Sequence, residues 1–204
     1  MKKMNRLFAL AMALCLAFAM MTVASASNEA TASGGSATSQ VTLSSTADGS
    51  LDGDPAATAM SVTVPTVLPI AVGTDGKVTT ATDAEIINNS YGAVKVSSVS
   101  IQAAQDWKLT AFGDPSTLAA ARVDSNQVGS AMTIGGGQQL ATVAGSTASQ
   151  DLLTSAVEGC YMTGSGDQVG NRVAIDYDAI VTPVSNAVTN TGVASVLFVV
   201  EWDI

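Results

Sequence analysis

Two pairs of carboxylates are the residues of this 204-residue chain best suited to chemistry. Asp176 and Asp178 form one pair, and Glu201 and Asp203 form the other. Residues i and i+2 of a strand project from the same face. Each pair could therefore supply the acid and the base of glycoside hydrolysis. The solvent-facing side of a strand in an acidic protein carries such pairs routinely, so we expect them to be surface groups.

Histidine is absent from the sequence. Its absence excludes Ser-His-Asp and Cys-His nucleophilic catalysis, and it excludes His-ligated zinc. The acidic run DGSLDGD at residues 48–54 lacks the spacing and the closing Glu of an EF-hand loop, so it is expected to be a solvated turn. We therefore expect a protein that is not an enzyme and that has no metal site and no cofactor.

The N-terminal 26 residues have the layout of a signal peptide. Lys2, Lys3 and Arg6 precede an apolar run at residues 7–23, and the small residues 24–26 (Ala-Ser-Ala) suit signal peptidase. The alternative is an uncleaved membrane anchor. Cleavage after residue 26 predicts an exported protein, secreted or held at the cell surface, with no further membrane segment.

Removing the leader changes the charge and the cysteine content. Five basic residues remain against 17 acidic ones, a net charge of −12. This balance argues against nucleic-acid binding, which needs clustered Lys and Arg. Cys15 leaves with the leader, so Cys160 cannot form an internal disulfide. It is expected to be a small core residue, with an intermolecular bridge as the alternative.

Residues 27–58 form a low-complexity segment rich in Ser, Thr, Ala, Gly and Asp. Such a composition buries too little apolar surface to offset its ordering entropy, which predicts a flexible segment. Within it, residues 40–44 (Gln-Val-Thr-Leu-Ser) alternate like a short strand. This piece could pair with the protein's own sheet, or add to a neighbouring subunit. The alternative is a linker with two chance apolar residues.

Residues 59–204 are expected to form one β domain. Residues 61–72 alternate but contain Pro65 and Pro69, which predicts an edge strand or two short strands with a kink. Residues 93–103 predict a long strand whose apolar phase switches at Ser97 and Ser98, as a β-bulge would require. A short helix is expected over residues 114–122.

The C-terminal part contains the clearest strands. One is predicted at residues 171–181, and another at residues 193–202 (VASVLFVVEW). The second is apolar throughout, so we expect a central strand buried on both faces. About ten short strands separated by turn residues predict an all-β fold. The expected architecture is an antiparallel β-sandwich, Ig-like or jelly-roll-like.

Two tryptophans lie in related tripeptides. Trp107-Lys108-Leu109 follows a predicted strand, and Trp202-Asp203-Ile204 closes the sequence. These tripeptides resemble the paired W-x-L motifs of WxL domains, which are peptidoglycan-binding domains of Gram-positive bacteria. The resemblance implies a binding site formed by Trp107, Leu109, Trp202 and Ile204. In the alternative interpretation, each indole fills the core of the sandwich.

Residues 61–112 also have the order of a Pro-interrupted strand, an Asp-Gly turn, an Asn-Asn-Ser turn and a strand running to tryptophan. This layout is similar to that of the biofilm-fibre β-sandwich proteins that include TasA and camelysin. Camelysin is described as a metalloprotease, but an H-E-x-x-H motif is missing here, so that activity is not expected.

Two functions therefore remain. One is a structural subunit of a cell-surface layer or fibre that pairs with copies of itself by strand addition. The other is a module that binds peptidoglycan or another glycan without a covalent link.

Overall fold

The computed structural model describes residues 43, 45–46, 49–50, 53 and 56–204. The predicted signal peptide lies outside the described residues, as does most of residues 27–58; of the predicted strand at 40–44, only Leu43 is described. Residues Thr58–Ile204 form a compact unit. Within the part of the chain that is described, no helix is long and apolar enough to cross a membrane.

The larger sheet has six strands. Their order is β1-β4-β11-β7-β6, and β8 also pairs with β7. These strands are β1 (Val62–Thr63), β4 (Glu85–Asn88), β11 (Arg172–Val181), β7 (Gln127–Ile134), β6 (Lys108–Leu109) and β8 (Leu140–Ala141). All of their pairs are antiparallel except β6 with β7, which run parallel.

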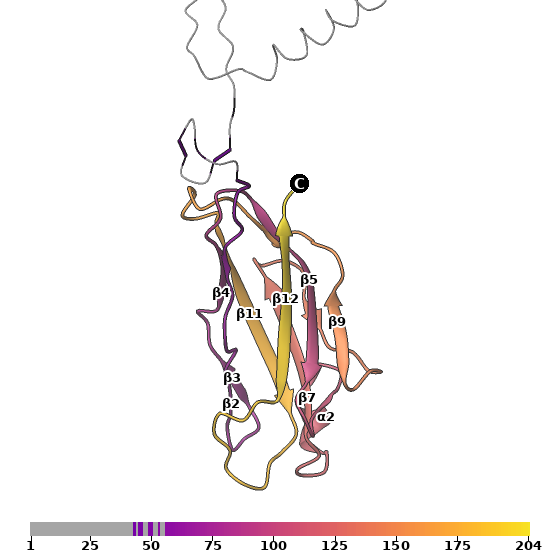
Figure 1. The fold of residues 1–204 in the computed structure, drawn as a ribbon. Helices are drawn as coiled ribbons and strands as arrows, with labels where there is room; N and C mark the ends of the chain where they lie inside the picture. The colour runs from indigo at the N-terminus through magenta and orange to yellow at the C-terminus, as the bar shows by residue number, and fades with distance from the viewer. Residues whose placement is uncertain (1–42, 44, 47–48, 51–52, 54–55) are drawn as a thin grey trace, which may run out of the picture. The chain divides into compact units, whose positions relative to one another are not determined.

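The smaller sheet has four strands in the order β10-β5-β12, with β9 also paired to β5 (Figure 1). These strands are β5 (Val94–Ala103), β9 (Ser149–Leu153), β10 (Tyr161–Met162) and β12 (Ala194–Trp202). A separate hairpin joins β2 (Ile70–Val72) to β3 (Val78–Thr80), and one short helix, α2, covers Ser116–Ala119.

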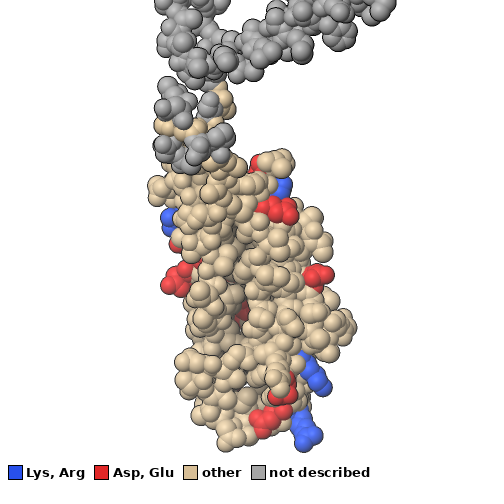
Figure 2. Space-filling model, in the orientation of Figure 1, with Lys and Arg blue, Asp and Glu red and all other residues tan. Residues whose placement is uncertain are grey.

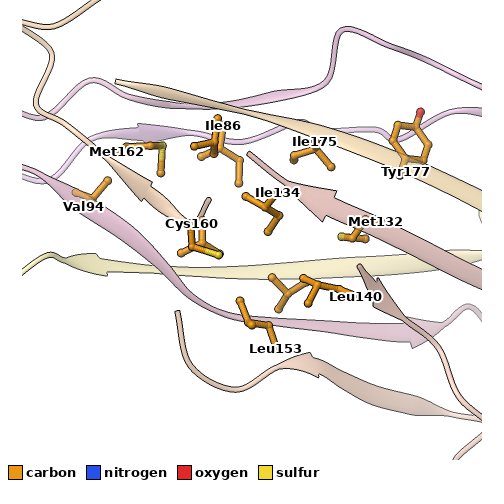
Figure 3. Packing of buried hydrophobic residues seen from close by; sticks show 13 residues of the cluster. Ile86, Val94, Met132, Ile134, Leu140, Leu153, Cys160, Met162, Ile175 and Tyr177 are labelled. Carbon is orange, nitrogen blue, oxygen red and sulfur yellow. The ribbon is translucent and has the colours of Figure 1, made fainter. Parts of the chain in front are cut away.

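The main hydrophobic core contains side chains from both sheets, as Figure 3 shows. Period-2 alternation explains it: on β11, Val173, Ile175 and Tyr177 are buried while the residues between them are exposed. The smaller sheet contributes residues from β5, β9 and β10. The buried members of this core are Ile86, Val94, Val96, Val99, Met132, Ile134, Leu140, Leu153, Cys160, Met162, Val173, Ile175 and Tyr177.

Several local predictions are confirmed. Pro65 and Pro69 lie between two short strands, β1 and β2. The register of β5 against β12 shifts so that Ser97 has no opposite residue, which is the predicted bulge. The predicted helix at 114–122 is only four residues long, because just Ser116–Ala119 adopt helical geometry.

One prediction about strand position is wrong. Residues 193–202 were expected to form a central strand buried on both faces, but β12 lies at the edge of the smaller sheet and pairs only with β5. Its burial alternates along its whole length, and Leu197 on its outer face is 61% exposed. The alternation is not evident in the sequence, because the outward-facing Leu197 and Val199 are apolar like the inward-facing residues between them.

Candidate assembly interface

Strand β12 has one unpaired edge. Its nine residues pair with β5 from Ala194 opposite Ala103 to Trp202 opposite Val94. No described residue forms a backbone ladder with its other edge. The outermost strands elsewhere in the described sheets are short, from two to five residues. The free edge of β12 is therefore the longest one that the described strands present.

The core-facing side chains of β12 are incompletely covered. Val196, Phe198, Val200 and Trp202 pack against the main core, yet each is only partly buried. On the neighbouring β5, by contrast, the core-facing Val94, Val96 and Val99 are all 0% exposed. The difference follows from position, because β5 has strands on both sides and β12 has a strand on one side only.

The edge also lacks the usual protection against pairing. Natural edge strands are commonly short, or carry Lys or Pro to block the addition of another strand. β12 is nine residues long, contains no Pro, and has Glu201 as its single charged residue. Figure 2 shows that most of the middle of this face of the molecule is uncharged, and that charged side chains lie mainly along its margins and at its lower end.

Electrostatic interactions concentrate away from the middle of β12. Lys95 Nζ lies 3.5 Å from Asp203 Oδ1, just beyond the end of the strand. Arg172 Nη1 lies 3.2 Å from Glu85 Oε1 on the larger sheet. Neither pair reaches the central part of the edge, so an incoming strand would meet backbone groups and apolar side chains there.

Three carboxyl groups with lowered pKa values lie in loops. Hydrogen bonds from the backbone N–H and the hydroxyl of Ser116 lower the pKa of Asp114, and hydrogen bonds from the hydroxyl and the backbone N–H of Ser185 lower the pKa of Asp124. The pKa of Asp167 is lowered by hydrogen bonds from the N–H groups of Gly170 and Val169 and from the Thr163 hydroxyl. These carboxylates accept bonds from their own loops, which is a structural role.

The two tryptophans lie at opposite ends of the smaller sheet. Trp202 is opposite Val94, where β5 begins, and its ring covers Gly92: a Cβ there would lie 3.0 Å from the indole Cζ3. Trp107 follows the other end of β5, where its backbone N–H donates to the carbonyl oxygen of Ala104. The ten residues of β5, a strand of roughly 30 Å, lie between these two positions.

The four residues predicted as a binding site are therefore not brought together. Leu109 is 2% exposed and belongs to a small cluster with Ile101 and Val128, against which Trp107 packs. Ile204 is fully exposed. A shallow hollow of about 480 Å³ on the outer face of the smaller sheet, lined in part by Tyr161 and Glu201, contains neither indole.

All four carboxylates of the two predicted pairs belong to exposed residues. Asp176 and Asp178 project from the exposed face of β11, as the spacing predicts. Among the described residues, no group of three or more His, Cys, Asp and Glu side chains is arranged to hold a metal ion. Cys160 is a buried, unpaired thiol in the main core.

The sequence interpretation missed the residues that define the interface. Val196, Phe198 and Val200 were predicted to lie in a fully covered strand. β12 contains neither the Pro nor the Lys that commonly marks an edge strand, so its residues carry no signal of its position. Leu197 and Val199 are exposed because they lie on the outer face of the smaller sheet.

No family model matches the chain, and no curated protein or solved structure matches it.

Proposed function

We propose that this protein is a non-enzymatic structural subunit of an exported cell-surface layer or fibre, in which copies are joined by strand addition. The observation that carries the proposal is β12, with a nine-residue unpaired edge and half-buried core-facing side chains. An added strand would bind the free backbone groups and cover those side chains. The fold assigned to this role is an antiparallel β-sandwich, Ig-like or jelly-roll-like.

The incoming strand is residues 40–44 of another copy. Their alternation would place Val41 and Leu43 toward the core side of β12, next to Phe198, and polar residues on the outer side. Leu43 is 96% exposed. The low-complexity segment 27–58 attaches this strand to the β unit and supplies the reach to a neighbour.

A proline at an outward-facing backbone position tests the edge. In Val196→Pro the N–H that faces away from β5 is removed, whereas in the matched Val196→Ala the N–H stays and only side-chain contacts are lost. Purified residues 27–204 should polymerise, as seen by light scattering and electron microscopy. Val196→Ala should still polymerise and Val196→Pro should not, with melting temperatures confirming that both fold.

Deleting residues 27–58 tests the donor. The shortened chain should lose polymerisation, and it should bind a fluorescently labelled peptide of residues 36–48, as anisotropy measures. A chain of residues 27–204 that stays monomeric over a wide concentration range would refute the proposal.

The alternative is a module that binds cell-wall peptidoglycan. It would need Trp107 and Trp202 to act as separate sites, since they lie at opposite ends of β5. We prefer the assembly proposal because the unpaired edge of β12 is continuous, and the incompletely covered core-facing side chains lie along that same edge.

A further inference from the structure

The backbone groups on the free edge of β12 can be assigned by parity. The N–H of Ala104 donates to the carbonyl of Val193, and the N–H of Asp203 donates to that of Ala93, so both ends of β12 bond to β5 through odd-numbered residues. In an antiparallel ladder, residues alternate between bonding to the partner and facing away from it. The extra residue of the bulge, Ser97, is on β5, so parity along β12 is kept.

The even-numbered residues of β12 therefore point their N–H and C=O groups outward. They are Ala194, Val196, Phe198, Val200 and Trp202. These same residues have the core-facing side chains. A strand that bonds to this edge would also lie against the incompletely covered side of the core.

This edge is complementary to itself. If two copies of β12 pair antiparallel with Phe198 opposite Phe198 of the partner, all nine residues overlap, and every outward-facing residue meets another. Val196 then lies opposite the partner's Val200, and Leu197 opposite the partner's Val199. Glu201 lies opposite the partner's Ser195, so like charges do not meet.

We propose that, when no N-terminal strand is bound, β12 pairs with β12 of a second copy about a two-fold axis at Phe198. The smaller sheets of the two copies then form one continuous sheet, and their half-buried apolar residues become contiguous. Two-fold contacts of this isologous kind are the commonest in soluble oligomers. The inference deepens the proposed function, on which it rests: the same edge is held by a second copy until residues 40–44 replace it.

Residues 58–204 are the material for the test, because they form a compact unit with its own core and lack the donor strand. Light scattering should give twice the mass of one chain. Val196→Ala should remain dimeric, and Val196→Pro should be monomeric with a melting transition.

Cysteine crosslinking tests the register. In a Cys160→Ala background, Phe198→Cys places the two thiols opposite one another, with Cα atoms about 5.5 Å apart, within disulfide range. Val196→Cys is the matched control. Position 196 faces the partner's Val200, so the two thiols at position 196 are four residues, or roughly 13 Å, apart along the strands. Oxidation should crosslink Phe198→Cys almost completely and Val196→Cys hardly at all.

The outcomes separate this inference from the proposed function. A monomer of residues 58–204 up to about millimolar concentration, or crosslinking at 196 instead of 198, overturns the two-fold pairing. So does a dimer that Val196→Pro leaves intact. If residues 58–204 dimerise as described while residues 27–204 do not polymerise, the proposed function fails and the self-pairing of β12 stands.

Discussion

The hydroxyl of Tyr177 donates a 2.7 Å hydrogen bond to the carbonyl oxygen of Pro69. The hydroxyl oxygen of Tyr177 also accepts a hydrogen bond of 3.2 Å from the backbone N–H of Ala81. Tyr177 lies on β11, whereas Pro69 and Ala81 flank the β2–β3 hairpin, which shares no ladder with either of the larger sheets. One buried side chain on β11 thus bonds to both ends of the hairpin.

Replacing Tyr177 by Phe should destabilise the protein by about 1–2 kcal/mol, because both backbone partners lose their bond while the ring packing is retained. Hydrogen exchange should accelerate mainly over residues 70–81. Urea denaturation and mass-spectrometric exchange measure the two effects. Tyr91→Phe is the control, since Tyr91 is 87% exposed and should tolerate the change. An unchanged exchange rate in the hairpin would contradict this role of Tyr177.

Substitution of either tryptophan should lower stability without changing retention on cell walls. Both indoles pack against core clusters, so Trp107→Ala and Trp202→Ala should each cost about 1–3 kcal/mol, less than for a fully buried ring. Thermal melting and peptidoglycan pull-down are the measurements. Loss of pull-down with an unchanged melt would instead favour the wall-binding alternative.

The stability of the loop at residues 163–171 should depend on the charge of Asp167. Its pKa is lowered by hydrogen bonds from Gly170 N–H, Val169 N–H and the Thr163 hydroxyl. A carboxyl with a lowered folded-state pKa contributes fully above its unfolded value, about 3.9, and loses that contribution as the pH falls through the folded value.

Asp167→Asn should therefore be less stable than the wild type at pH 7, and this difference should shrink steadily below about pH 4. Denaturant melts from pH 7 to pH 2 measure it. Asp176→Asn, on the exposed face of β11, controls for the loss of one negative charge. A difference that stays constant with pH would show that the hydrogen bonds of the carboxylate do not stabilise the loop.

Local features of the fold were predictable, and pairings between distant segments were not. The switch in the apolar phase at Ser97 predicted the bulge, because the alternation of apolar and polar residues can be followed within a single strand. The edge position of β12 and the parallel pairing of β6 with β7 depend on which distant strands meet. For the candidate interface, Phe198 was recognisable as a strand residue, but its incomplete cover follows from the sheet order alone.

A run of three glycines, as at residues 135–137, is typical of a turn, and this run lies in the connection from β7 to β8. The structure adds a second requirement for glycine there. A Cβ on Gly137 would lie 2.3 Å from the carbonyl oxygen of Glu158, a backbone atom of a neighbouring loop. Gly136 has open space around it but a φ of +71°.

The two neighbouring glycines should therefore respond differently to alanine. Gly136→Ala meets only the cost of a left-handed backbone, about 1–2 kcal/mol. Gly137→Ala must push the two loops apart, and should cost about 2–3 kcal/mol and speed hydrogen exchange at residues 158–160 as well. Denaturant melts and exchange measurements on both variants test this. If both variants lost the same unfolding free energy, and exchange around Glu158 did not change, the close contact between the two loops would not be a reason for glycine at position 137.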